Sequence, residues 1–324
     1  MTLSIAVIGC GWVSNARHGP AYQEYAASHP SARLSACCDL DAQRAEDFRD
    51  QFGFARAYRD PFTLLEHERP DVICLNVPPE VTCALGGEIL RRGIPLLSEK
   101  PPGLNRAEID RLISAADRGG APHQVAFNRR YMPLATELRA RLADSPVEHV
   151  AIQMARVDRR DDNFATTAIH SIDTARFLAG SDFAHLRIHY QELPWLGPQV
   201  ANFTLDGIFE NGTTAQLSFQ PCSGADLERS QVYARDQVFL WDVNTGLDVP
   251  GRLRHFRAGQ LAADLDAIQF CGRSESYFLN GFYQEDAAFF DALSAGRPPL
   301  NSFRACRQSV EIMESLSTRA QNYP

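Results

Sequence analysis

The start of the chain constrains the fold more than any other stretch. Positions 3–8 form an apolar run that predicts a buried strand, and positions 9–14, G-C-G-W-V-S, follow it directly. Apolar side chains then recur at the spacing of one helix face, at Ala21, Tyr22, Tyr25 and Ala26. A strand, a glycine-rich turn and a helix in this order are typical of a dinucleotide-binding unit, because the helix N-terminus attracts the pyrophosphate.

Each small residue of this loop has a physical role in such a unit. Gly9 permits the tight turn, Gly11 lets the backbone approach the pyrophosphate, and Ser14 is small enough for close packing of helix on strand. The predicted cofactor-binding residues of the loop are Gly9, Gly11, Trp12 and Val13.

The end of the second predicted strand, residues 34–38, indicates which dinucleotide binds. Asp39 follows this strand, and a carboxylate there can accept hydrogen bonds from both ribose hydroxyls of the adenosine, which favours NAD. Arg44 lies close behind and could meet a 2′-phosphate, so NADP is also compatible. Asp41 competes with Asp39 for the role of helix cap.

Strands and helices continue to alternate through the first part of the chain. Residues 71–77 predict a strand with Asn76 near its end, residues 80–92 a helix stopped by Gly93, and residues 122–127 a further strand. The alternation predicts an α/β fold with a Rossmann, doubly wound parallel sheet over residues 1–123. Asn76 is predicted to contact the cofactor.

Residues 94–103, I-P-L-L-S-E-K-P-P-G, place two opposite charges at another strand end. Open α/β sheets bind ligands at the carboxyl ends of their strands, so Glu99 and Lys100 are candidate site residues. Pro101 restricts the backbone of Lys100 and thereby where its amine points. The alternative is a surface turn that carries charges.

The second half, residues 124–324, has a different pattern of predicted helices and strands. A helix containing Thr166, His170 and Asp173 ends at Gly180, and strands then follow one another without intervening helices. This pattern predicts an α+β domain with a large open, mostly antiparallel sheet. Its helices are too few to cover both faces, so a homodimer or homotetramer built through this sheet is the hypothesis.

Composition excludes several classes of protein. The net charge of the 324 residues is −8 without a clustered basic face, which argues against nucleic acid or an anionic membrane as partner. The apolar runs are too short to span a membrane, and the first strand leaves no room for a signal peptide, so we expect a cytoplasmic protein. The eight cysteines lack metal-ligand spacing, and we predict free thiols and no metal site.

Several polar residues are ambiguous by themselves. A lone histidine on an apolar helix is more often structural than catalytic, and His170 gains weight only from its place beside the other motifs. Asp173 lies one turn further on, where it can orient the imidazole or hold a loop. Asn128 follows a strand end, and Arg129 and Arg130 either meet an acidic substrate or pair with surface acids.

Three motifs together resemble the Gfo/Idh/MocA (glucose–fructose oxidoreductase / inositol dehydrogenase) family. They are the G-C-G-W-V-S loop, Glu99-Lys100-Pro101 and the segment 169–173, I-H-S-I-D; the segment 128–133, N-R-R-Y-M-P, is similar to the family's as well. The resemblance implies NAD(P)-dependent oxidation or reduction at a secondary alcohol carbon of a sugar, cyclitol or related polyol. It also implies dimers or tetramers built through the second sheet.

The resemblance further implies site roles. Lys100 would hydrogen-bond the reacting hydroxyl, His170 would act as general base, and Glu99 would contact Lys100 or the nicotinamide ribose. Many members carry an aspartate where this chain has Thr166, so His170 should be less easily protonated here and the substrate should differ. The predicted substrate-binding residues are Thr166, Asp173, Asn128 and Arg130.

Two other functions compete with this dehydrogenase. One is an NAD-dependent glycoside-cleaving enzyme that oxidises its sugar transiently. The other is a non-catalytic sensor that binds dinucleotide and a partner protein, although such a sensor would need neither Lys100 nor His170.

Overall fold

The computed structural model describes residues 3–142, 145–160, 163–243 and 251–324. The chain forms two compact units, here called unit 1 (Met1–Asn128 with Ser276–Val310) and unit 2 (Arg129–Glu275 with Glu311–Pro324). Our sequence-based boundary assigned everything after residue 123 to the second domain. The structure differs, because a late segment of the chain returns to unit 1.

Unit 1 is built on a six-stranded parallel sheet with the order β3-β2-β1-β4-β5-β6. Its strands are β1 Leu3–Ile8, β2 Ala32–Cys38, β3 Arg56–Tyr58, β4 Val72–Leu75, β5 Leu96–Glu99 and β6 His123–Ala126. The connecting helices are the π-helix η1 Ser14–His18, α1 Gly19–Ser28, α2 Ala42–Phe52, α3 Pro61–Glu68, α4 Pro79–Arg91 and α5 Arg106–Gly119. The predicted doubly wound parallel sheet is therefore confirmed.

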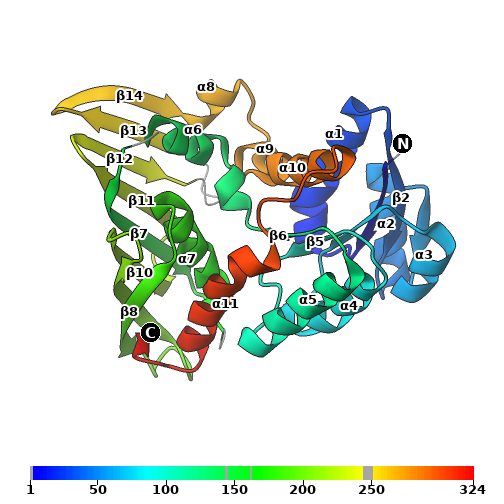
Figure 1. The fold of residues 1–324 in the computed structure, drawn as a ribbon, viewed down its shortest axis with the longest axis horizontal. Helices are drawn as coiled ribbons and strands as arrows, with labels where there is room; N and C mark the ends of the chain where they lie inside the picture. The colour runs from blue at the N-terminus through cyan, green and yellow to red at the C-terminus, as the bar shows by residue number, and fades with distance from the viewer. Residues whose placement is uncertain (1–2, 143–144, 161–162, 244–250) are drawn as a thin grey trace. The chain divides into compact units, whose positions relative to one another are not determined.

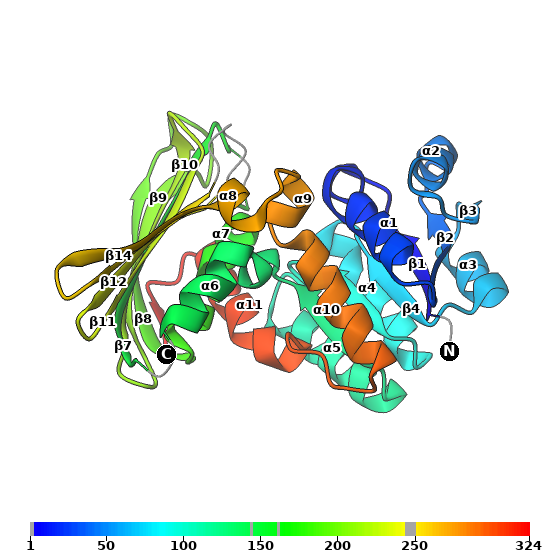
Figure 2. The same ribbon diagram turned by 90° about the horizontal axis from the view of Figure 1, so that it is seen from above.

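Helices cover both sides of this sheet. Figures 1 and 2 show α4 and α5 on one side of the strands and α1 with α10 (Phe282–Ser294) on the other. Asn105 caps α5, since its side chain accepts a hydrogen bond from the Glu108 backbone amide at 3.0 Å. The short strand β3 and helix α3 were not expected from the sequence, because three residues carry too little periodicity to detect.

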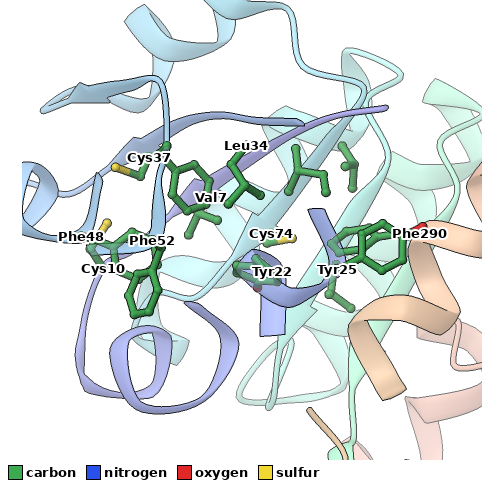
Figure 3. Close-up of a cluster of buried hydrophobic side chains, with 14 of the residues drawn as sticks. Val7, Cys10, Tyr22, Tyr25, Leu34, Cys37, Phe48, Phe52, Cys74 and Phe290 are labelled. Atoms are coloured by element: carbon green, nitrogen blue, oxygen red, sulfur yellow. The ribbon is translucent and has the colours of Figure 1, made fainter. Parts of the chain in front are cut away.

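The core of unit 1 explains why the late segment belongs to it. Phe290 of α10 packs against Tyr25 of α1, with ring centroids 4.9 Å apart, within the buried cluster of Figure 3. Phe289 and Phe290 are both fully buried, and each such ring contributes about 1.5–3 kcal/mol of transfer free energy. The helix α9 Ser276–Leu279 precedes α10, and α11 Phe303–Ser317 follows it.

Unit 2 is built on a nine-stranded sheet with the order β14-β13-β12-β11-β7-β10-β9-β8-β15. Its strands are β7 Val147–Val157, β8 Phe183–Glu192, β9 Ala201–Phe209, β10 Thr214–Ser223, β11 Leu227–Ala234, β12 Gln237–Asp242, β13 Arg252–Arg257, β14 Gln260–Asp266 and β15 Asn322–Tyr323. β7 and β10 pair in parallel, and the other pairings are antiparallel. This confirms the predicted large, mostly antiparallel sheet.

Helices α6 Pro133–Leu142 and α7 Ala165–Ala179 pack on one face of that sheet, with the short helix α8 Ala267–Cys271 beside α6 (Figures 1 and 2). Side chains alternate accordingly, so that Val150, Ile152 and Met154 of β7 are buried while Gln153 is exposed. A hairpin turn joins β9 to β10, and Gly212 there takes a φ of 86°.

Two further observations concern the whole described chain. No helix among the described residues is long and apolar enough to cross a membrane. All eight cysteines are free thiols, and five of them are buried.

Candidate active site

The glycine-rich loop of unit 1 joins β1 to η1 and α1. Gly9 has a φ of +99°, and a Cβ atom built there would lie 2.1 Å from the carbonyl oxygen of Asn76. A Cβ at Gly11 would instead meet no heavy atom within 4 Å. The two glycines therefore differ: Gly9 is required by the fold, and Gly11 faces open space where a ligand can approach.

Polar side chains hold the loop in place. The buried hydroxyl of Ser14 donates to the Gly9 carbonyl at 2.6 Å, and the amide of Asn15 donates to the Cys10 carbonyl at 2.7 Å. Trp12 is largely exposed and lies under the guanidinium of Arg17, 5.6 Å from its ring centroid. Cofactor contacts from Trp12 and from the half-buried Val13 stay predictions.

Asp39 lies where the sequence placed it, at the end of β2 and against the loop. One carboxylate oxygen accepts from the Cys10 amide at 2.9 Å, and the other accepts from the Asp41 amide at 3.0 Å and from the Arg44 guanidinium at 3.3 Å. Asp41 is the cap of α2, since its side chain accepts from the amides of Gln43 and Arg44. Asp39 therefore contacts the loop and Asp41 caps α2, a choice that the sequence left open.

A cavity of about 480 Å³ opens beside these residues. It lies at the carboxyl ends of β1, β2 and β4, the crevice where the strand order of a doubly wound sheet reverses. Its lining combines the polar Asp39 and Arg44 with an apolar wall from Leu40, Val81 and Leu85. Carboxylate, open backbone and apolar wall are what the ribose, pyrophosphate and adenine of a dinucleotide require.

The ends of β4 and β5 carry the other predicted residues of unit 1. The amide nitrogen of Asn76 donates to the hydroxyls of Ser14 at 3.1 Å and Tyr22 at 3.3 Å, so this group already has two acceptors within the protein. Glu99 accepts a hydrogen bond from the backbone amide of Lys100 at 2.8 Å. The cofactor roles of Asn76 and Glu99 stay predictions.

Glu99 also reveals two residues that the sequence analysis missed. Its other carboxylate oxygen lies 3.0 Å from Nε2 of His18, whose Nδ1 lies 3.0 Å from Asp286. Burial alone would lower the pKa of His18, but the two carboxylates outweigh it and raise that pKa well above its ordinary value. His18 follows the glycine-rich loop closely, which could have signalled it, whereas nothing in the sequence around Asp286 links it to this site.

Lys100 has another property that is visible in the sequence once its position is known. It is the single lysine of the chain, among 32 basic residues of which the others are arginine. Arginine supplies a permanent charge, whereas a lysine amine can release its proton. Lys100, directly after β5, is therefore the one residue among these 32 whose side chain can release its proton readily.

The remaining candidates are Asn128 of unit 1 and four residues of unit 2, two of which form an ion pair. Arg130 makes two hydrogen bonds to Asp173, at 2.6 and 2.7 Å, and Asp173 is buried. The Thr166 hydroxyl donates to the Asn163 carbonyl at 2.9 Å within the first turn of α7. His170 lies half-buried on α7. Asn128, at the end of unit 1, is buried and donates to the Asn280 carbonyl at 2.9 Å. Their substrate-binding roles stay predictions.

Arg129 pairs with an acid of the protein, but this acid is not on the surface, as the sequence had suggested. It pairs with Glu228, and Arg156 holds the same carboxylate at 2.8 Å. Glu228 is buried, so this partner is not the surface acid that we expected. Burial alone would raise the pKa of Glu228, but the charges and hydrogen bonds of the two arginines lower it from 4.5 to about 2.

Among the described residues, no group of three or more histidine, cysteine, aspartate and glutamate side chains is placed to hold a metal ion.

The fold and loop of unit 1 define a dinucleotide-binding Rossmann protein. Residues 3–127 match the family model GFO_IDH_MocA, described as an oxidoreductase family with an NAD-binding Rossmann fold. Residues 3–127 of the chain are therefore similar to the NAD-binding domain of this oxidoreductase family.

Named relatives lie at low to moderate identity. Inositol 2-dehydrogenase 2 of Saccharopolyspora erythraea is 31% identical over 199 residues, 58% of this chain and 57% of that protein. D-apiose dehydrogenase of Paraburkholderia graminis is 27% identical over 189 residues, 54% of this chain and 49% of that protein. The matches therefore span about half the length of these relatives.

A solved structure extends the likeness of fold to nearly the whole chain. The crystal structure of a dehydrogenase from Chromobacterium violaceum superposes with a TM-score of 0.85 at 16% identity, over 98% of this chain and 95% of that one. At this identity the likeness concerns the fold alone.

Proposed function

We propose that this protein is an NAD(H)-dependent oxidoreductase that transfers hydride at a secondary alcohol carbon of a sugar, cyclitol or related polyol. The observation that carries the proposal is the cavity of unit 1, where the open backbone at Gly11 and the carboxylate of Asp39 face one crevice. The inositol and apiose dehydrogenases among its relatives support the substrate class.

The contacts of Asp39 favour NAD over NADP. Two backbone amides and Arg44 hold the carboxylate against the loop, so a 2′-phosphate would have to approach a fixed negative charge. Arg44, the cation that could compensate, already pairs with both Asp39 and Asp41. The ribose hydroxyls of NAD, in contrast, can donate to the carboxylate.

In this proposal each part of the protein supplies position or proton transfer. A bound nicotinamide accepts or delivers the hydride. The loop and Asp39 bind the adenosine pyrophosphate half, and the strand ends at Asn76 and Glu99 bind the nicotinamide ribose. Lys100 hydrogen-bonds the reacting hydroxyl and His170 removes its proton, while Thr166, Asp173, Asn128 and Arg130 bind the remaining substrate groups.

The test combines binding and turnover. Purified protein is titrated with NADH and NADPH, followed by nicotinamide fluorescence, and a polyol and sugar panel is read at the nicotinamide absorbance. We expect NADH to bind more tightly than NADPH and at least one panel member to reduce NAD. Tight NADH binding without net reduction by any member contradicts the dehydrogenase. Absence of dinucleotide binding contradicts the whole proposal.

The single lysine allows a sharp second test. Lys100→Arg keeps the positive charge but cannot release a proton at accessible pH, so we expect turnover to fall at least about 100-fold with NADH affinity within about twofold. Lys100→Ala should lose at least as much turnover. The control is Arg106→Ala, an exposed cation at the start of α5, which should leave turnover unchanged. Normal turnover of Lys100→Arg contradicts a proton role for this residue.

A further inference from the structure

Three ionisable side chains from distant parts of the chain meet inside unit 1. His18 comes from η1, Glu99 from the end of β5 and Asp286 from α10. The side chains of His18 and Asp286 are at most 1% exposed, and that of Glu99 is 14% exposed. Asp286 approaches Nδ1 of the imidazole with both oxygens, at 3.0 and 3.1 Å, and Glu99 approaches Nε2 at 3.0 Å.

This geometry determines the protonation state of the imidazole. An ionised carboxylate only accepts hydrogen bonds, and a neutral imidazole has a single N–H donor. Both nitrogens of His18 face a carboxyl group, so with both carboxyl groups ionised both contacts are hydrogen bonds only when His18 is an imidazolium. In a buried cluster an unprotonated nitrogen facing a carboxylate would cost free energy, because two lone pairs would meet without a proton between them.

Aromatic rings flank the imidazole of His18. Tyr22 of α1 stacks on the imidazole with ring centroids 5.6 Å apart, and Phe282 of α10 meets it edge-on at 5.0 Å. The thiol of Cys74 on β4 interacts with Tyr22, and burial raises the pKa of both groups, so both are neutral. The charges that act most on His18 are those of Asp286 and Glu99, and the charge of Lys100 acts in turn on Glu99.

The cluster connects the glycine-rich loop to Lys100. Glu99 uses one oxygen for His18 and the other for the backbone amide of Lys100, so its carboxylate is held at both ends. At the other side, Tyr22 receives a hydrogen bond from Asn76, which also bonds Ser14 of the loop. A continuous series of contacts therefore runs from Ser14 to Lys100.

We propose that His18 is a positioning residue: held by Asp286, it keeps the Glu99 carboxylate on the backbone of Lys100 and offsets the negative charge that Glu99 presents to the Lys100 amine. If Glu99 lost the imidazolium of His18, its full negative charge would act on that amine, which already interacts with Glu99. An ammonium paired with a carboxylate holds its proton more strongly and is less available to a substrate hydroxyl. The effect on turnover rests on the proposed function, but the arrangement of charges does not.

The single lysine makes the arrangement measurable without substrate. In protein labelled with 13C at lysine Cε, one side-chain signal reports Lys100, and its titration gives the pKa of the amine directly. His18→Gln removes the imidazolium, and Asp286→Asn favours the neutral imidazole, so each variant leaves the Glu99 carboxylate without its counter-charge. We expect each to raise the pKa of Lys100 by at least about half a unit.

Two controls separate positioning from damage to the fold. Asp291→Asn removes another carboxylate from α10, one that accepts from Tyr25 at 2.8 Å and lies outside the cluster, and should leave the lysine titration unchanged. The double variant His18→Gln with Glu99→Gln removes the freed carboxylate, so it should return the pKa of Lys100 to the wild-type value or below. If His18 had only a structural role, His18→Gln would lower the stability of the protein and leave the pKa of Lys100 unchanged.

The wild-type protein supplies a second measurement, on the ring of His18 itself. The 15N spectrum of the His18 ring at about pH 8, assigned by its absence in His18→Gln, should show both nitrogens protonated. A neutral ring at that pH, or an unchanged lysine titration in folded His18→Gln, overturns the proposal. If wild-type protein turns over no substrate, the proposed function fails while both spectra still decide this inference.

Discussion

Replacing Glu228 by glutamine should destabilise unit 2 far more than the loss of one exposed carboxylate would. Glu228 is buried between Arg129 and Arg156, and the side chains of both arginines are only 12% exposed. Glutamine offers one acceptor oxygen and turns an N–H₂ group toward guanidinium donors, so two largely buried cations lose their counter-charge.

The size of the effect follows from the pKa of Glu228. Its lowering from 4.5 to about 2 corresponds to about 3 kcal/mol of stability, at about 1.4 kcal/mol for each pKa unit. Because the folded-state pKa lies below the unfolded value, this contribution is complete above about pH 4.5 and is lost as the pH falls toward 2. The difference between wild type and variant should therefore be constant near neutral pH and shrink in acid.

The assay is urea unfolding followed by the fluorescence of Trp241, which is buried on β12 of unit 2. The matched control is Asp264→Asn, because Asp264 also makes two hydrogen bonds to one arginine, Arg252, but on the exposed β13–β14 hairpin. We expect no measurable change from the control. A loss below about 1 kcal/mol for Glu228→Gln, or an equal loss for Asp264→Asn, refutes the reasoning.

Two further predictions concern the cofactor site. Gly9→Ala should cost at least about 2 kcal/mol of stability, since its Cβ would overlap the Asn76 carbonyl at a φ of +99°, whereas Gly11→Ala should unfold normally and weaken NADH binding about tenfold or more. Equal stability losses in urea unfolding for the two would contradict the distinction. Asp39→Ser should lower the ratio of NADPH to NADH dissociation constants by about tenfold or more, while Arg44→Ser should raise it if Arg44 partly offsets the carboxylate. An unchanged ratio in Asp39→Ser would remove Asp39 from the choice of cofactor.

Local patterns account for what the sequence predicted correctly. The apolar run before Gly9, the alternation of strands and helices, and the antiparallel strands after residue 180 each depend on neighbours within a few positions. The positions of Asp39, Asn76 and Glu99 at strand ends follow from the same patterns. The cavity at these ends follows in turn, because parallel strands place their carboxyl ends on one edge of the sheet.

Contacts between distant residues account for what the sequence could not show. His18 lies 81 positions from Glu99 and 268 from Asp286, and Arg129 lies 99 positions from Glu228. Charged residues are common on protein surfaces, so nothing in the sequence singles out these few as buried partners. Asp173 shows the same limit, since its pairing with Arg130 was not visible from its place one turn after His170.

The sequence by itself determined the fold of both units and the place of Lys100 at a strand end, because backbone geometry ties each element to a short residue period. Tertiary structure alone decided that residues 276–310 return to unit 1 and bring Asp286 to His18. It also decided which of the two acids after β2 faces the loop, Asp39, and which caps α2, Asp41. Burial and pairing are properties of the packed chain, and they set the charges from which the chemistry of the site follows.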